Sequence, residues 1–169
     1  MDIAVITEYF TKYGAVAIFV MVFLEYLNLP GFPAGIIMPL AGIFARQGAI
    51  SFPVAMLLTL GAGLLGSLML YGAGYLGGDM FLRFYTRKFP KQKPVIEKHI
   101  EWLRGKGCIG VFTAKLLPAV RTLISLPAGA MKMNLWKYIV SSAAGIFLWN
   151  LVFIGAGYLL GDTVFTYLG

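Results

Sequence analysis

Three charged side chains lie within stretches of this sequence that are otherwise apolar: Glu25, Lys115 and Arg121. A charge in the middle of a membrane segment costs roughly 3 kcal/mol or more, so such residues are rare unless they pair with one another or carry a function. Each of the three lies within five residues of a proline, and proline breaks a helix. The sequence therefore predicts a charged site in an apolar environment, close to two breaks in helical structure.

Binding of a phosphate group is the chemistry that suits these residue types. The guanidinium of Arg121 is a planar fork that matches two phosphate oxygens, and the ammonium of Lys115 adds a mobile point charge. Helices that begin after Pro33 and Pro118 would offer free backbone N–H groups, which also favour anions. Glu25 would neutralise the two cations when no ligand is bound, and it could exchange a proton during a transport cycle.

A purely structural interpretation is the alternative. Glu25 could form an ion pair with Arg121 or Lys115 that holds two helical segments together, because such pairs are common inside membrane proteins. Lys115 could instead extend its side chain to the aqueous surface. The residue types alone do not decide between a binding site and an ion pair.

The composition of the chain explains where these charges must lie. Hydrophobic residues make up 59% of the 169 residues and charged residues 12%, against about 25% charged residues in soluble domains. Residues 50–78 and 138–161 contain no charge, and each stretch exceeds the ~20 residues that cross a bilayer. Asp2 and Glu8 stand where a signal peptide would be basic, so we expect the first apolar stretch to belong to the mature protein. These features predict a multi-pass integral membrane protein.

Basic residues are concentrated between the apolar stretches. The net charge is +7, and eight of the fourteen basic residues lie within residues 83–106. A short basic loop beside membrane spans is typical of the cytoplasmic side and also attracts anionic lipid headgroups. This distribution argues against nucleic acid as a partner.

The sequence contains an internal repeat. GAGYLGGD at residues 72–79 recurs as GAGYLLGD at residues 155–162, an offset of 83 with seven of eight residues identical. Upstream, Leu29-Pro30 followed by Pro39 matches Leu117-Pro118 followed by Pro127 at an offset of 88. Two matches in the same order indicate a duplication. We expect one membrane domain over residues 1–169, with repeat one at 13–79, a basic connector at 80–106 and repeat two at 107–162.

Each repeat has two short apolar runs followed by one long run. The short runs cover residues 14–28 and 33–45 in repeat one, and residues 107–117 and 123–131 in repeat two. Since none of them is long enough to cross a bilayer, each pair is predicted to form a re-entrant helical hairpin with its tip at Pro30 and Pro33 or at Pro118. One kinked crossing helix per pair is the alternative.

The order of these elements predicts the topology. One crossing helix separates the two hairpins, so they enter from opposite faces and the repeats are inverted, as in many transporters. The basic connector, with an amphipathic helix, then lies in the cytoplasm and both termini lie outside. The predicted fold class is an all-α integral membrane protein with two opposed re-entrant hairpins flanked by transmembrane helices.

The same residues resemble the DedA family, whose wider superfamily includes the eukaryotic VTT-domain proteins. The similarity lies in Phe23-Leu24-Glu25, in the proline-rich segment with Leu40-Ala41-Gly42, and in residues 115–122 with the Pro-Ala-Gly at 127–129. It covers nearly the whole chain, from Gly14 to Asp162. The resemblance implies two opposed re-entrant hairpins, and it implies a role in the recycling of undecaprenyl phosphate, in phospholipid movement or in proton-motive-force homeostasis. It also implies that Glu25, Lys115 and Arg121 are the membrane glutamate and the two basic positions of the family.

Two positions depart from the pattern of that family. Gly35 stands where many members have an acidic residue, which puts proton coupling through two acids in doubt. Lys115 stands where arginine is usual, and a lysine does not bind phosphate through two parallel hydrogen bonds.

Function is predicted to be transport rather than catalysis. The leading prediction is a flippase or scramblase for a phosphate-bearing lipid in the bacterial inner membrane, and the alternative is a proton-coupled transporter of ions or small solutes through Glu25. A phosphatase is disfavoured, because no histidine, cysteine or pair of carboxylates lies near the predicted tips. A structural assembly factor is a further class. No cofactor or metal site is expected, and the sequence leaves open the lipid, the coupling ion and whether the chain forms a homo-oligomer.

Overall fold

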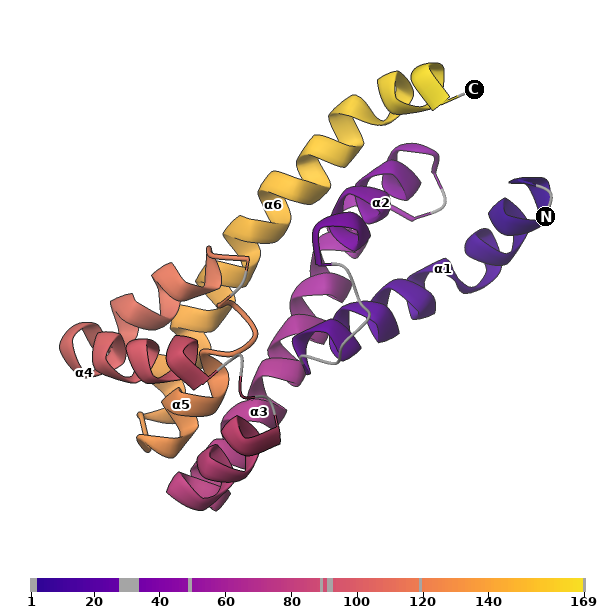
Figure 1. Ribbon diagram of the computed structural model, residues 1–169. Helices are drawn as coiled ribbons and strands as arrows, with labels where there is room; N and C mark the ends of the chain where they lie inside the picture. The colour runs from indigo at the N-terminus through magenta and orange to yellow at the C-terminus, as the bar shows by residue number, and fades with distance from the viewer. Residues whose placement is uncertain are drawn as a thin grey trace.

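The computed structural model describes residues 3–27, 34–48, 50–88, 90, 93–118 and 120–168, and these residues form helices and turns. The described residues form six helices, which follow one another in the order shown in Figure 1. Their bounds are α1 Ile3–Tyr26, α2 Ala34–Arg46, α3 Phe52–Lys88, α4 Lys93–Lys115, α5 Ser125–Ala130 and α6 Leu135–Leu168. The predicted all-α class is confirmed.

Two of the helices are long and apolar enough to cross a membrane. The segments Phe52–Gly78 of α3 and Leu135–Gly161 of α6 each contain 27 residues with a hydropathy of 1.9. At 1.5 Å per residue each is about 40 Å long, which exceeds a hydrocarbon core of about 30 Å. Large apolar side chains such as Leu57 and Leu159 point outward from these segments, as expected of a surface in contact with lipid.

Two glycines bend the helices α3 and α4, which contain the basic connector. Gly78 (φ 49°) interrupts α3, and Gly107 (φ 51°) interrupts α4. Positive φ is readily adopted only by glycine, so the chain can turn sharply at both positions. The predicted connector is therefore helical in two segments, residues 79–88 after the first bend and residues 93–106 before the second.

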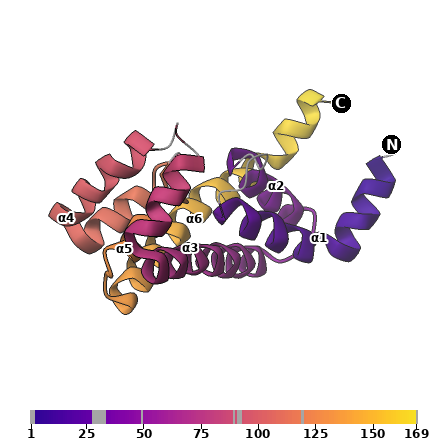
Figure 2. The same ribbon diagram turned by 60° about the horizontal axis from the view of Figure 1, so that its bottom comes forward.

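The predicted hairpin regions contain breaks between helices. Pro30 and Pro33 lie outside the described residues, between α1 and α2, whereas Pro118 lies exposed in a turn between α4 and α5. α1 begins at Ile3 rather than near Gly14, because a helical backbone continues through the charged residues that ended the apolar run. The pair α1–α2 extends from the end of the molecule where α1 begins and α6 ends, and the pair α4–α5 lies toward the opposite end (Figures 1 and 2).

The two repeats are interlocked, because the short second helix of each packs on the long helix of the other. α2 lies against α6 and α5 lies against α3, whereas α1 and α4 pack on the long helix of their own repeat. Glycines bring the backbones together. A Cβ on Gly42 would meet the carbonyl oxygen of Ile154 at 2.1 Å, and one on Gly129 would meet that of Tyr71 at 2.0 Å.

These two contacts are equivalent under the repeat. Ile154 and Tyr71 are separated by the offset of 83 found in the sequence, and Gly42 and Gly129 are separated by 87. A second pair of glycine contacts obeys the same two offsets: Gly74 on Leu126 and Gly157 on Pro39. The contacts thus relate the two short helices by an offset of 87 residues. This is one less than the offset of 88 found from the matching prolines in the sequence.

Candidate functional site

The three predicted charged residues come together in the interior of the molecule. Glu25 lies in the last turn of α1, Lys115 is the last residue of α4, and Arg121 lies in the turns that lead to α5. The guanidinium of Arg121 forms an ion pair with Glu25. Arg121 and Lys115 are 0% exposed and Glu25 is 4% exposed. Residues that are 96 positions apart in the chain therefore form one buried cluster.

The turns after α4 place Arg121 deep in the molecule. The backbone N–H of Arg121 donates to the carbonyl oxygen of Leu117 at 2.9 Å, and that of Ile124 donates to Val120 at 3.0 Å. Pro118 lacks an N–H and ends the regular helix just before these turns. Consecutive turns in place of a helix let the guanidinium point inward although Pro118 itself is exposed.

Lys115 is held by two hydroxyl groups. Its Nζ donates to Ser67 Oγ at 2.8 Å and to Ser125 Oγ at 3.1 Å. Its side chain also packs on Gly145 of α6, where a Cβ would lie 2.5 Å from Lys115 Cβ. The side chain thus points into the interior, so the alternative in which it extends to the aqueous surface is wrong.

Two aromatic rings flank the cations. The Cζ of Arg121 lies 5.1 Å from the centre of the Tyr26 ring and 4.9 Å from the Trp149 ring. The Nζ of Lys115 lies 5.4 Å from Tyr26. These distances are within the range of cation–π attraction, which is strongest where water is excluded. Sequence reasoning did not predict this role for either ring, and the only signal was that Tyr26 adjoins Glu25.

Several buried donors of the cluster have no hydrogen-bond acceptor among the described residues. They include Nε and Nη1 of Arg121, Nε1 of Trp149 and the hydroxyl of Tyr26. Most buried polar groups in proteins are paired, so such a group of donors calls for an explanation. The described buried charges are two cations and one carboxylate, and the surplus donors together with the surplus positive charge suit an anion with several oxygen atoms.

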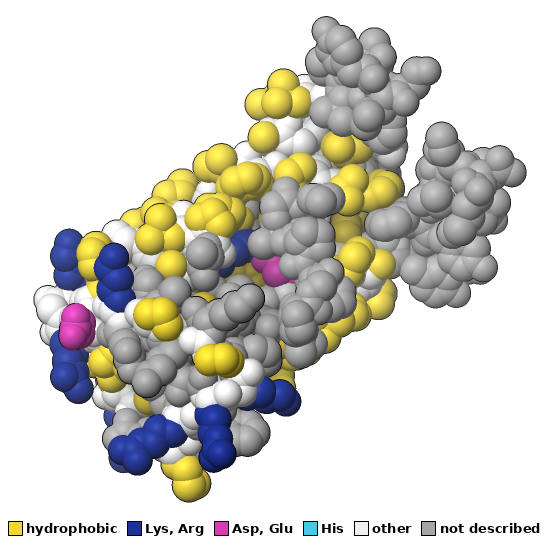
Figure 3. Space-filling view, in the orientation of Figure 1, with side chains coloured by type: hydrophobic (Ala, Val, Ile, Leu, Met, Phe, Trp, Pro, Cys, Tyr) yellow, Lys and Arg dark blue, Asp and Glu magenta, His cyan; other side chains and the backbone are white. Residues whose placement is uncertain are grey.

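Charges on the surface are separated from this cluster. In Figure 3 an acidic and a basic side chain lie in a hollow near the middle of the molecule, while most basic side chains gather at the end formed by α4 and the last part of α3. Apolar side chains cover much of the surface between them. The basic residues at that end are exposed: Arg83, Arg87, Lys88, Lys98, Arg104, Lys106, Lys132 and Lys137.

A polar contact between the two long helices lies beside the cluster. The Nδ2 of Asn150 donates to the hydroxyl of Thr59 at 2.9 Å. Asn150 is the repeat counterpart of Ser67, which accepts the hydrogen bond from Lys115. Asn150 therefore links the two long helices, α6 and α3.

An all-helical chain with two long apolar spans and a buried cluster of charges is a multi-pass membrane protein with a polar interior site. The chain belongs to the VTT-domain family, whose model matches residues 32–159, and this confirms the resemblance to DedA proteins. No solved structure matches the chain.

Curated relatives cover most of the chain. The undecaprenyl phosphate transporter A of Staphylococcus aureus (strain NCTC 8325 / PS 47) is 31% identical over 94% of this chain and 80% of its own length. The protein of that name from Bacillus subtilis (strain 168) is 28% identical over 95% of this chain and 78% of its own length. An alkaline phosphatase-like protein of Lactococcus lactis subsp. cremoris (strain MG1363) is 28% identical over 94% and 76%.

Proposed function

We propose that the chain transports a phosphate-bearing lipid across the membrane, as a flippase or scramblase, with undecaprenyl phosphate or a phospholipid as the substrate. In this proposal Arg121 and Lys115 bind the phosphate near the middle of the bilayer. The observation that carries the proposal is the buried cluster in which two cations, Arg121 and Lys115, accompany one described buried carboxylate, Glu25, which pairs with Arg121. The names of the two transporter relatives support a lipid carrying phosphate as the substrate.

The buried cluster suggests how a headgroup is exchanged. Glu25 pairs with Nη2 of Arg121, and a phosphate would replace it there with two parallel hydrogen bonds. Ser67 and Ser125 keep the ammonium of Lys115 in place, so little rearrangement is needed on binding. The apolar chain of the lipid would remain in the bilayer. Release of Glu25 from the pair is the step at which a proton could be taken up.

The architecture that we propose is an inverted repeat of two re-entrant hairpins. The tips lie between α1 and α2 and between α4 and α5, and repeat one, the connector and repeat two cover residues 13–79, 80–106 and 107–162. Support comes from the equivalent contacts of Gly42 and Gly129 and from the two helix pairs extending from opposite ends of the molecule (Figure 1). Positive charge at the end that carries α4 favours a cytoplasmic location. We place the protein in the bacterial inner membrane.

Hydrolysis is a second candidate function. Lys115 lies beside the hydroxyls of Ser67 and Ser125, and a lysine next to a serine can activate it as a nucleophile. Relatives named alkaline phosphatase-like give a reason to test it. We favour transport, because in the described part of the chain the surplus buried donors of Arg121, Trp149 and Tyr26 suit binding of an anion.

Translocation of lipids in proteoliposomes tests the proposal. Purified protein is reconstituted with labelled undecaprenyl phosphate or with common phospholipids, and the rate of movement between leaflets is measured. Arg121→Lys keeps the positive charge opposite Glu25 but loses the fork. We expect transport to fall about tenfold or more, since a hydrogen bond to a charged group contributes roughly 1.5–3 kcal/mol. Release of phosphate is measured in the same vesicles to test hydrolysis.

Matched variants separate function from folding. Arg46→Lys makes the same substitution at an arginine whose Nη1 donates to the carbonyl oxygen of Tyr158 at 3.1 Å, far from the cluster, and transport should be retained. Glu25→Gln should abolish any proton-linked cycle but leave passive scrambling. If the loss of transport simply follows the loss of thermal stability across these variants, the cluster is structural and the proposal is wrong.

A further inference from the structure

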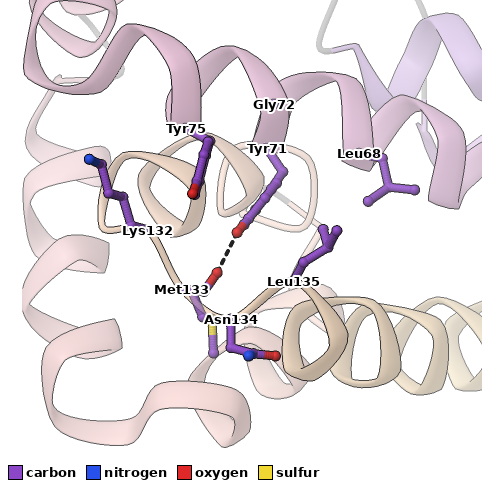
Figure 4. Close-up of a pocket in the computed structure, with 8 residues that line it drawn as sticks. All are labelled: Leu68, Tyr71, Gly72, Tyr75, Lys132, Met133, Asn134 and Leu135. Carbon is purple, nitrogen blue, oxygen red and sulfur yellow. Dashed lines mark hydrogen bonds between the residues drawn. The ribbon is translucent and has the colours of Figure 1, made fainter.

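A pocket of about 560 Å³ lies between α3 and the connection from α5 to α6, apart from the buried charges. Helix α3 forms one wall and the connection forms the other (Figure 4). The residues that line it are Leu68, Tyr71, Gly72 and Tyr75 on α3, and Lys132, Met133, Asn134 and Leu135 opposite. It has no part in the transport mechanism proposed above.

The two ends of the pocket differ in polarity. The ammonium of Lys132 and the hydroxyl of Tyr75 lie toward one end, whereas Leu68 and Leu135 lie toward the other (Figure 4). Between them the hydroxyl of Tyr71 donates to the backbone carbonyl of Met133, which fastens the connection to α3. A pocket with a cationic end and an apolar end fits an amphipathic anion.

The backbone at Lys132 is in a conformation that lysine rarely adopts. Its φ is 53°, the one positive value at a described residue other than glycine. The corresponding turn after α2 has Gly48, with a φ of 78°. In both turns the N–H donates to the carbonyl three residues earlier, at 2.8 Å in Lys132 and 3.3 Å in Gly48. Since glycine suits this turn, the turn itself does not require a lysine.

The side chain of Lys132 is exposed. Among the residues that the structure describes, no carboxylate forms an ion pair with Lys132. Lys137 adds a second exposed positive charge in the first turn of α6. Trp136 between them is 74% exposed, and exposed tryptophan beside lysine is typical of the boundary between headgroups and hydrocarbon.

We propose that this pocket binds an anionic phospholipid from the leaflet at the basic end of the molecule. The headgroup phosphate contacts Lys132 and Tyr75, and the upper part of one acyl chain lies against Leu68 and Leu135. The phosphate supplies a negative charge to Lys132, which pairs with no carboxylate of the described residues, and the acyl chain covers apolar surface at the other end. This site holds a lipid whether or not the central cluster transports one.

Native mass spectrometry of the purified, delipidated full chain tests the site. The protein is titrated in detergent with phosphatidylglycerol or with phosphatidylcholine of the same acyl chains. Lys132→Asn removes the charge and keeps a residue that tolerates positive φ. We expect phosphatidylglycerol to bind about fivefold more weakly, the effect of one basic residue near an anionic headgroup, and phosphatidylcholine to bind as before. Lys88→Asn changes an exposed lysine at the same end and should have little effect.

A second variant fills the pocket without changing its charge. A Cβ on Gly72 has no neighbour within 4 Å, so the side chain of Gly72→Leu would occupy the pocket and displace the lipid. Gly155→Leu is the control, because Gly155 is the repeat counterpart on α6 and is equally unobstructed. Any lipid bound at the central cluster should add the same amount to the bound lipid measured for every variant, because none of these substitutions changes the cluster.

Three results would overturn the proposal. Equal effects of Lys132→Asn and Lys88→Asn would mean that phosphatidylglycerol is held by overall surface charge. Wild-type binding in Gly72→Leu would mean that the pocket is not the site. Displacement of the lipid by glycerol 3-phosphate at similar concentration would mean that the site binds a free anion instead. Loss of transport in Arg121→Lys with unchanged lipid binding at Lys132 would leave this proposal intact.

Discussion

A single methyl group at the contact between α3 and α5 should destabilise the protein strongly. In Gly129→Ala the added Cβ would lie 2.0 Å from the carbonyl oxygen of Tyr71, against 3.4 Å for an ordinary contact. The obstacle is helical backbone, so no side-chain rotation relieves the overlap and the two helices must separate. Overpacking of this kind costs about 1–3 kcal/mol. We expect the free energy of unfolding to fall by about 2 kcal/mol.

Gly72→Ala is the matched control for this variant. It is the same substitution one residue further along α3 from Tyr71, at a position where a Cβ has no neighbour within 4 Å. Alanine is favoured over glycine in a helix by about 0.8–1 kcal/mol, so this variant should be as stable as the wild type or more stable. The two variants should therefore differ by roughly 3 kcal/mol, taking both effects together.

The repeat supplies a second arm of the same experiment. Gly42→Ala places a Cβ 2.1 Å from the carbonyl oxygen of Ile154, in the equivalent contact between α2 and α6. It should destabilise the protein about as much as Gly129→Ala. Unfolding by sodium dodecyl sulfate in mixed micelles, followed by circular dichroism, measures all three variants. Wild-type stability of Gly129→Ala would show that the helices are not this close, and an effect at only one of the two glycines would refute the equivalence of the contacts.

Three further predictions concern the interior and the topology. Ser125→Ala removes one hydroxyl acceptor of the buried ammonium and should destabilise the protein by about 1–3 kcal/mol, measured in the same unfolding assay; no change would mean that the hydrogen bond is not formed. Asn150→Ala and Thr59→Ala should each lower the free energy of unfolding by roughly 0.5–1.5 kcal/mol. Because both remove the same hydrogen bond, the double variant should lose no more than the larger single effect. Full additivity of the two effects would contradict this. A cysteine at Gln47 should react with an impermeant maleimide in intact cells and one at Lys98 only after lysis, both in a Cys108→Ser background; the reverse pattern would invert the proposed orientation.

Much of the architecture could be predicted because a bilayer restricts what an apolar sequence can do. The absence of charge in residues 50–78 predicted a crossing helix, and the apolar span of α3 ends at Gly78. The motif shared by residues 72–79 and 155–162 revealed the repeat. Neither pattern indicates which helix packs on which. The packing of α2 on α6 and of α5 on α3 depends on close backbone contacts made by Gly42 and Gly129. In the sequence these two residues cannot be told apart from the other glycines.

The candidate site was predictable in its charges but not in its surroundings. Glu25, Lys115 and Arg121 could be selected because charge is costly in hydrocarbon. Ser67 and Trp149 could not, since serine and tryptophan are ordinary in membrane helices and their role depends on which side chain lies opposite. The match between Pro39 and Pro127 also gave an offset of 88, one more than the contacts use: Pro39 lies inside α2, whereas Pro127 lies in the first turn of α5.

The exchange of short helices between the repeats has a consequence for how the chain is made. When α2 leaves the ribosome, the helix that covers it, α6, is still about 90 residues away in the sequence and takes several seconds to synthesise at 5–20 residues per second. During that interval the face of α2 that packs on α6 has no native partner, so the first half of the protein cannot complete its packing until α6 has been made. A protein of one repeat would have needed a second copy of itself to cover its short helix, so under the inverted-repeat architecture that we propose an antiparallel dimer is the natural precursor of this fold.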